Sequence, residues 1–391
     1  EGRFCEHRDE AGQRDGGPVI AVPAKEHRTG FNVWLNGYRG LCAMFVFVHH
    51  AARANVIPLP SGTPLKDLTR EFFMSLMYGV EMFFMISGFV ILGSLLRHDR
   101  ISGFLEDRAV RIFSAWVPAV IGVTAVCAAL QIEAFRNVSL AEGTSIFFAN
   151  LLLIPPLAPI PMVHSASWSL TYEWMFYFIA AAGALAYRRI PGRWWTYLVW
   201  IVPAVVLICL FPRSLFFITG VLVFRYREWF AQHSRWLKFP LVSLVIFLIA
   251  WRATGAGHAH LSVTMIDYVR DGRIVFALVA LLASIHLFAS VCVNASKQSS
   301  FLGSRTWQFL GNISYSFYLW HVLVMAAVKR IMSAVLPEME PVTALLVFVS
   351  VSFAIALPVS WLSWRLFEQR LAAALRGAFR NPRVVGRAAR V

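Results

Sequence analysis

The chain has 391 residues, of which 58% are hydrophobic and 15% are charged, and its mean hydropathy is +0.62. Soluble globular domains are nearer half apolar and a quarter charged, so this composition excludes an ordinary soluble enzyme and favours an integral membrane protein. The net charge of +15 lies in short basic segments between apolar runs, which fits membrane topology better than a nucleic-acid partner.

Residues 1–32 are polar, glycine-bearing and of mixed charge, and they lack the apolar core of a signal peptide. We therefore expect a disordered cytoplasmic extension there. Ten apolar segments follow, and they predict an all-α, polytopic transmembrane helical bundle, because a helix satisfies its own backbone hydrogen bonds in lipid. The segments are 33–54, 72–96, 110–130, 166–187, 195–212, 213–225, 238–253, 273–293, 307–333 and 342–366. The transmembrane domain thus covers 33–366, and a basic cytoplasmic tail, 367–391, follows it.

A further apolar run, 145–157, is too short to span a bilayer and stops at Pro155-Pro156, so we expect a re-entrant or interfacial segment. Treating it as non-spanning keeps the cluster of Arg188, Arg189 and Arg193 on the cytoplasmic side, as the positive-inside rule requires. Ten spans then place both termini in the cytoplasm and the basic tail against the anionic inner leaflet.

The first of five polar motifs lies in the first span. Arg39 and His50 are separated by about three helical turns, so they share a face and lie about 16 Å apart along the axis. A charged residue inside a membrane span costs about 2.5 kcal/mol or more, so it normally faces a protein interior or a water-filled cavity. The alternative is an interfacial role, with Arg39 at the headgroups and His50 at the far end of the helix.

The second and third motifs add acidic and cationic groups. Glu81 lies deep in apolar sequence, and its structural alternative is a neutral, hydrogen-bonded acid inside the bundle. Ser87 stands beside Gly88, and the structural alternative for this pair is a helix-packing site. Arg108 and Arg111 are three residues apart and share a helix face, which suits bidentate binding of a phosphate or pyrophosphate. Two arginines at an inner helix end are also ordinary topology signals.

The last two motifs lie in the fourth and ninth spans. Glu173 is flanked at a spacing of four by Ser169 and Tyr177, and a carboxylate on such a face can orient a histidine or relay a proton. Tyr318 and His321 share one face of the ninth span. A purely structural role is the alternative for Glu173 and for His321.

Together, in this order, the five motifs resemble the acyltransferase-3 family, integral-membrane enzymes that O-acylate carbohydrates and some other hydroxyl compounds. The resemblance covers residues 33 to 366 and rests on Arg-x10-His, Phe-Phe-x-x-Ser-Gly-Phe, Arg-x-x-Arg, Ser-Leu-x-x-Glu-x-x-x-Tyr and Ser-Tyr-x-x-Tyr-Leu-x-His. The chain departs from the family pattern twice. Glu81 stands where the family usually has Asp, and Ser114 stands where a proline often follows the arginines.

The resemblance implies a membrane-bound O-acyltransferase that moves an acyl group, usually acetyl, from acyl-CoA to a hydroxyl of a carbohydrate or lipid-linked sugar in the inner membrane of a bacterium. His50 would act as general base, and Glu173 would orient its imidazole or stabilise its charged form. The CoA phosphates would be held by Arg39, Arg108 and Arg111. The other substrate-binding candidates are Glu81, Ser87, Tyr177, Tyr318 and His321. A transient acyl-histidine or acyl-serine remains an open alternative.

No permanently bound cofactor is expected, and no metal site, because no two of the five cysteines have metal-ligand spacing. The main functional alternative is a transporter or flippase, in which buried Arg, His and Glu line a substrate or proton path. Missing inverted repeats and missing Gly/Pro-broken helix pairs count against it. A polymerase or ligase of lipid-linked glycans would require a large outer loop, which this sequence lacks.

Overall fold

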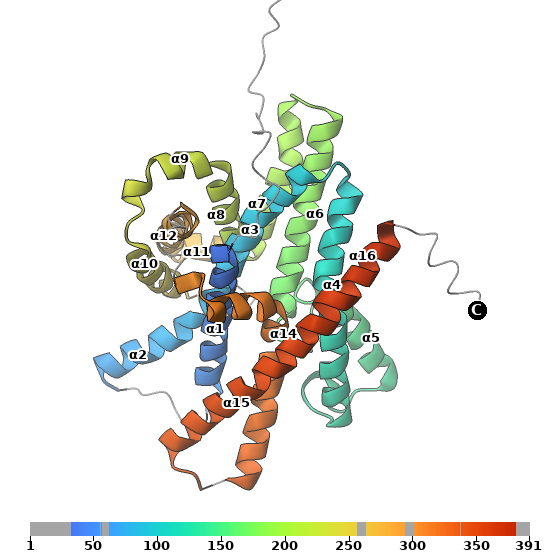
Figure 1. The fold of residues 1–391 in the computed structure, drawn as a ribbon, viewed down its shortest axis with the longest axis vertical. Coiled ribbons are helices and arrows are strands. Elements are labelled where there is room, and N and C mark those ends of the chain that lie inside the picture. The colour runs from blue at the N-terminus through green and yellow to red at the C-terminus, as the bar shows by residue number, and fades with distance from the viewer. Residues whose placement is uncertain are drawn as a thin grey trace, which may run out of the picture. The chain divides into compact units, whose positions relative to one another are not determined.

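The structure is a computed structural model that describes residues 33–54, 56, 62–255, 263–293, 301–336 and 338–380. The regular elements in these ranges are all helices (Figure 1). Their bounds are α1 (Val33–Arg53), α2 (Pro64–Ser75), α3 (Gly79–Arg97), α4 (Ile101–Ala129), α5 (Leu140–Leu151), α6 (Ser167–Arg189), α7 (Leu198–Leu210), α8 (Phe216–Arg225), α9 (Arg227–Gln232), α10 (Pro240–Ala253), α11 (Met265–Arg270), α12 (Ile274–Val293), α14 (Arg305–Val335), α15 (Pro341–Ser363) and α16 (Ala372–Arg380). The predicted all-α fold is confirmed, and the predicted extension at 1–32 lies outside the described residues.

Each of the ten predicted spans overlaps a helix, but length and hydropathy alone support fewer crossings. Five helical stretches are long and apolar enough to cross a membrane: Pro64–Arg97, Ile101–Ala129, Ile274–Val293, Arg305–Val335 and Pro341–Phe379. α1 and α6 have 21 and 23 residues, but they carry polar side chains of the motifs, which lower their hydropathy. α7 and α10, with 13 and 14 residues, are short for a hydrocarbon core of about 30 Å. An integral membrane protein is therefore supported, while the count of about ten spans stays a prediction.

The short apolar run and the basic tail are both partly helical. α5 covers the first part of 145–157 and has 12 residues, so at about 18 Å it is too short to cross a bilayer. α15 continues through a π-helical turn, Trp364–Leu371, into α16. The predicted domain end at residue 366 therefore falls inside one continuous helical stretch, and residues 381–391 lie outside the described part of the chain.

α1 and α14 form the closest helix pair of the motif-bearing core. They approach backbone to backbone because Gly311 has no side chain: a Cβ atom there would lie 2.0 Å from the carbonyl oxygen of Asn36. The Asn36 side chain in turn donates to the Gln308 carbonyl at 3.1 Å and to the Asn312 side chain at 3.0 Å. These contacts fix the register of α1 against α14, the helices that carry the first and fifth motifs.

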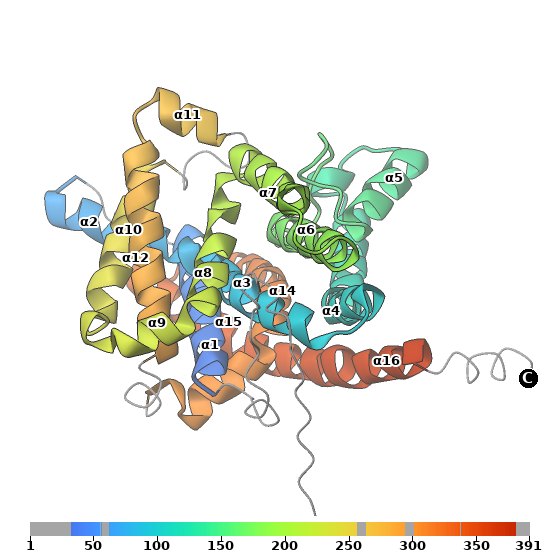
Figure 2. The ribbon, with the colours of Figure 1, turned by 90° about the horizontal axis from the view of Figure 1, so that it is seen from above.

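The remaining motif helices pack around this pair. α3 contacts α1, α6 and α8, and α4 contacts α6 and α14. α10 packs on α12, which in turn packs on α8. In Figure 2, α1, α3 and α14 lie between α8, α10 and α12 on one side and α4 and α6 on the other. All five motifs therefore lie on helices that meet in the middle of the bundle.

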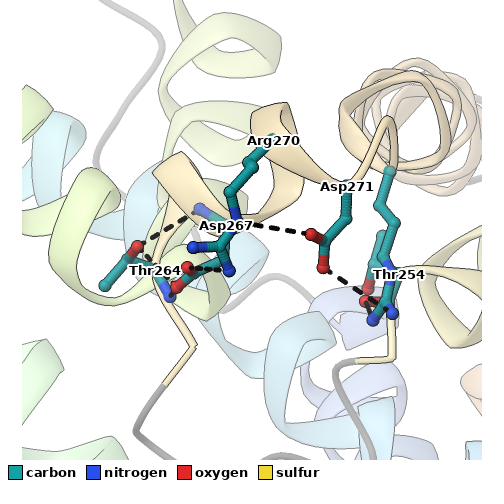
Figure 3. Close-up of polar contacts among 6 residues, drawn as sticks. Thr254, Thr264, Asp267, Arg270 and Asp271 are labelled. Atoms are coloured by element: carbon teal, nitrogen blue, oxygen red, sulfur yellow. Dashed lines mark hydrogen bonds and ion pairs between the residues drawn. The ribbon is translucent and has the colours of Figure 1, made fainter.

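A polar network links Thr254 with residues 264–273, on either side of α11 (Figure 3). Thr264 caps α11 in a capping box with Asp267, whose carboxylate accepts from the N–H and the hydroxyl of Thr264, both at 2.8 Å. These hydrogen bonds lower the pKa of Asp267. Arg273, just before α12, donates to the Thr254 carbonyl at 3.4 Å and lies 3.7 Å from Asp271. The network therefore ties the end of α10 to the start of α12.

Candidate active site

A cavity of about 60 Å³ lies among α1, α3, α4, α6 and α14. Its wall consists of Arg39, Val80, Phe83, Phe84, Ile86, Ser87, Arg111, Ser169, Leu170, Glu173, Ser314, Tyr315 and Tyr318. Each of the five motifs contributes at least one of these residues, so segments far apart in the sequence meet in one space. Among the predicted site residues, the cavity wall includes Arg39, Ser87, Arg111, Glu173 and Tyr318 and leaves out His50, Glu81, Arg108, Tyr177 and His321.

Glu173 is held in the cavity wall by two hydroxyl groups. Ser87 Oγ donates to its Oε1 at 2.7 Å, and the hydroxyl of Tyr177 donates to the same oxygen. Tyr177 lies one turn after Glu173 on α6, whereas Ser87 reaches it from α3. Tyr177, on the predicted face of the fourth span, and Ser87, in the second span, therefore fix the Glu173 carboxylate together.

Gly88, next to Ser87, lets α3 pack closely against α8. A Cβ atom at Gly88 would lie 2.1 Å from the Phe217 carbonyl oxygen, and one at Gly220 would lie 2.0 Å from the Met85 carbonyl oxygen. α3 and α8 therefore touch backbone to backbone at this point, and the glycine is required for that approach. The expected helix-packing role of the Ser-Gly pair and its polar role are both present, on adjacent residues.

Arg39 and Arg111 bring two guanidinium groups to the cavity, from α1 and α4. Arg39 is half-buried and Arg111 is exposed. Within the described part of the chain, neither guanidinium makes a hydrogen bond or a close ion pair, and the carboxylates that interact with both at longer range are Glu173 and Glu368. Unused guanidinium donors are suited to a phosphate group. The cavity wall can therefore present two forked donors to an anion.

Arg108 lies one turn before Arg111 but is directed elsewhere. Its Nη2 donates to Ser94 Oγ at 3.3 Å, and its guanidinium carbon lies 5.9 Å from the ring centre of Phe104 and 6.0 Å from that of Tyr177. A spacing of three residues puts both arginines on one helix face, but only Arg111 lines the cavity. The structure thus pairs Arg111 with Arg39 across two helices and leaves Arg108 outside the cavity wall.

His50 and His321 form a pair between α1 and α14. His321 Nδ1 lies 2.8 Å from the Phe317 carbonyl oxygen, and since a carbonyl only accepts, this nitrogen carries the proton of the neutral ring. His321 Nε2 then accepts from His50 Nδ1–H at 3.1 Å, and the same Nδ1 lies 2.9 Å from the Val46 carbonyl oxygen. This tautomer, assigned from the hydrogen-bond network, leaves the lone pair on Nε2 of His50. A neutral imidazole oriented in this way is suited to act as a general base.

The contact that orients His50 differs from the expected one. The hydrogen-bond partners of Glu173 are Ser87 and Tyr177, so the orienting position assigned to it from sequence is occupied by His321 instead. His49 is buried, its ring meets that of His50 edge to face at 5.2 Å, and its Nδ1 has no hydrogen-bond partner among the described residues. The two adjacent histidines therefore have different surroundings, and His50 is the one that pairs with α14.

Tyr318 links the cavity with the histidine pair. It lines the cavity, its hydroxyl lies 2.9 Å from Ser169 Oγ, and its ring centre is 6.2 Å from that of His321. The cationic cavity and His50 are therefore neighbouring sites along α1 and α14 rather than parts of one pocket.

Glu81 lies away from the cavity in a buried ion pair. Its carboxylate is fully buried and accepts from Arg213 at 2.6 and 3.1 Å and from Trp251 Nε1 at 3.0 Å. A buried carboxylate with a cationic partner and a third donor is satisfied within the bundle, so the structure favours the structural alternative for Glu81. Sequence reasoning missed Arg213 as its partner, although a single arginine between two apolar runs was a visible signal.

Glu368 was also missed from the sequence. It lies in the π-helical turn after α15 and accepts from the Ser316 N–H at 3.0 Å and from Ser316 Oγ at 2.6 Å. Its charge interacts with those of Arg39 and Arg111. It is the only acidic residue after Glu340, and this isolation in an arginine-rich segment was the available signal.

Comparison with known proteins places the chain in a family. The sequence model of the acyltransferase domain of the acyltransferase-3 family matches residues 32–365. The chain is similar to acyltransferase MdmB of Streptomyces mycarofaciens, with 26% identity over 322 residues, 76% of this chain and 80% of that protein. It is also similar to exopolysaccharide production protein ExoZ of Rhizobium meliloti (strain 1021), with 26% identity over 271 residues, 64% of this chain and 77% of that protein. No solved structure matches the chain. Because the family match covers nearly the whole helical domain and favours an enzyme over a transporter, the chain belongs to the acyltransferase-3 family and is an acyltransferase.

Proposed function

We propose that this enzyme moves an acyl group, with acetyl as the first candidate, from acyl-CoA to a hydroxyl of a carbohydrate or lipid-linked sugar. We place it in the bacterial inner membrane with both termini in the cytoplasm. The observation that carries the proposal is the arrangement along α1, where the cavity arginine Arg39 and the oriented imidazole of His50 are about three turns apart. The name of the exopolysaccharide production protein supports a carbohydrate acceptor.

The two cavity arginines would bind phosphate groups of the donor. A space of about 60 Å³ has room for one phosphate group or a few water molecules, so the nucleotide part of the donor would lie outside it. The thioester end would extend along α1, past Tyr318, towards His50. Glu173 would balance the charge of Arg39 and Arg111 while the donor site is empty.

His50 would act as the general base. Its Nε2 takes the proton of the acceptor hydroxyl while the hydroxyl oxygen bonds to the thioester carbonyl carbon. The carbon–sulfur bond then breaks, and the leaving CoA thiolate takes the proton from the imidazolium. During this step the Nδ1–H of His50 keeps its two acceptors, the Val46 carbonyl and His321 Nε2, which stabilise the positive charge. General base catalysis of this kind contributes about 10²–10⁴-fold to a rate.

The decisive experiment is acyl transfer by the purified full chain in lipid nanodiscs with labelled acetyl-CoA. We expect label to appear in an ester of a carbohydrate fraction from the bacterial envelope, and CoA release to depend on that fraction. Comparing the ester content of surface glycans with and without the gene then identifies the acceptor. If no envelope fraction accepts label and CoA release does not exceed the uncatalysed rate, the donor and acceptor assignments both fail.

A further inference from the structure

Glu368 is fixed by the middle of α14. Its Oε1 accepts both the N–H and the hydroxyl of Ser316, and Ser316 lies well inside Arg305–Val335, where backbone N–H groups normally bond only within the helix. The Ser316 hydroxyl also lies 3.0 Å from that of Ser363, which accepts from Trp320 Nε1 at 2.9 Å. The carboxylate is therefore braced from both α14 and the end of α15.

The turn that carries Glu368 is shaped to bring it inward. The stretch Trp364–Leu371 is π-helical, a conformation that is rare and recurs at functional sites. This turn contacts α14 and also α4, the helix of Arg111. The π-helical turn therefore directs the Glu368 carboxylate towards the cavity helices and away from the basic surface segment around it.

Four charges face one another across these helices. Arg39 and Arg111 are positive, Glu173 and Glu368 are negative, and each arginine interacts with both carboxylates. Glu368 makes no hydrogen bond to either guanidinium in the described structure, and its Oε1 accepts from the N–H and the hydroxyl of Ser316. Arg108 adds a third guanidinium, which interacts with Arg111 and Glu173. The two carboxylates therefore offset part of the positive charge, while the guanidinium donors of Arg39 and Arg111 remain unused.

We propose that Glu368 is a positioning residue that acts as a restrained counter-ion: Ser316 keeps it off the cavity arginines, and from there it weakens their hold on an anionic ligand. This inference rests on the proposed CoA donor. The Glu368 carboxylate lowers the positive potential at Arg39 and Arg111, so the phosphates of CoA would bind less tightly than they would without it. Weaker binding favours release of the CoA product after each turnover.

Two substitutions are expected to shift CoA affinity in opposite directions. Glu368→Gln keeps an oxygen that can accept from Ser316 but removes the charge, so CoA should bind about threefold to tenfold more tightly. Ser316→Ala removes the hydroxyl brace and leaves the charge, so the carboxylate can turn towards the arginines and CoA should bind about threefold more weakly. Glu106→Gln is the matched control: it removes one negative charge from an exposed position on α4 and should leave the affinity unchanged.

The measurement is calorimetric titration of the purified full chain in nanodiscs with CoA, together with thermal unfolding of each variant. Affinity shifts of opposite sign in the two variants support the inference. Unchanged or weaker binding by Glu368→Gln, with the wild type binding normally, would overturn it and leave Glu368 as a structural brace. If Glu368→Gln does not fold, wild-type affinity in Ser316→Ala overturns it equally. Absence of CoA binding by the wild type would instead refute the CoA donor of the proposed function, and with it the counter-ion role of Glu368 towards CoA.

Discussion

His321 Nε2 lies 3.1 Å from His50 Nδ1, although the two residues come from helices at opposite ends of the sequence. The pairing rests on the close contact of α1 with α14, which Gly311 makes possible. It selects one tautomer of His50 and so decides which ring nitrogen has the free lone pair. The catalytic assignment can therefore be tested on both partners and on the neighbouring histidine.

Replacing His50 should abolish transfer without loss of the fold. His50→Ala removes the proposed base, so kcat should fall by about 10²–10⁴-fold, while the detergent-solubilised protein keeps its unfolding temperature. His49→Ala is the matched control, because His49 points to a different environment one residue earlier. An essential His49 and a dispensable His50 in the same assay would show that the base has been misassigned.

His321 should affect kcat more than KM. His321→Ala removes an acceptor of the His50 Nδ1–H and loosens the ring, so we expect kcat to fall roughly tenfold to a hundredfold with little change in the KM for acyl-CoA. His321→Gln offers an amide oxygen as acceptor and should recover part of the rate. A rise in KM with kcat preserved would identify His321 as a substrate-binding group instead.

Arg111 and Arg108 should respond differently to lysine. Lysine keeps the charge but loses the forked, planar donors, so Arg111→Lys should raise the KM for acyl-CoA about tenfold to a hundredfold, equivalent to about 1.5–3 kcal/mol. Arg108→Lys should change KM much less, because the Arg108 guanidinium bonds to Ser94 outside the cavity wall. Steady-state kinetics of the two variants separate these cases, and equal effects would restore the pairing of Arg108 with Arg111.

Glu81 should matter for stability rather than for substrate binding. Glu81→Gln leaves the Arg213 charge buried without its counter-ion, which typically costs about 3–5 kcal/mol, so the unfolding temperature should drop markedly. Replacing both partners by apolar residues, as in Glu81→Leu with Arg213→Met, should recover much of that loss. Normal stability of Glu81→Gln together with a raised KM would mean that Glu81 contacts a substrate.

The number of spans can be checked by cysteine labelling in a variant that lacks the native cysteines. Single cysteines near Arg189 and in the segment 98–106 should react only from the cytoplasm, and cysteines near Glu142 and Glu338 only from outside. Labelling near Arg189 from the outside would mean that the chain crosses the membrane once more in the 145–157 region.

Periodicity was enough to predict the helices, and five of the ten site residues proposed from the motifs line the cavity. Helical spacing sets which face a side chain shares, and Arg39, Ser87 and Glu173 meet because the faces of α1, α3 and α6 converge. The partners of these residues were harder to predict, because a contact between distant helices has no local signature. Glu81 pairs with Arg213 across 132 residues, and Glu368 reaches Ser316 only through a π-helical turn.

Long flexible side chains were the second source of error. Arg108 and Arg111 share a helix face as their spacing requires, but each arginine has several rotatable bonds after Cβ. The neighbours of each then decide its direction, namely Ser94, Phe104 and Tyr177 for Arg108 and the open cavity for Arg111. Glu173 lies in the cavity wall, but its hydrogen-bond partners are Ser87 and Tyr177 and not His50, the partner expected from the sequence.

α1 runs without interruption from Val33 to Arg53, so it fixes the distance and the rotation between Arg39 and His50. Both the length and the rotational phase between them follow from helix geometry alone, at about 1.5 Å and 100° per residue. Substitutions at intervening positions that preserve the helix leave this spacing unchanged, except at Gly40, where a Cβ atom would lie 2.9 Å from the Gly311 nitrogen on α14. Inserting or deleting a single residue would turn the imidazole away from α14 while keeping every motif residue in the sequence. The spacing of the motif is therefore expected to tolerate changes of side chain and not changes of length.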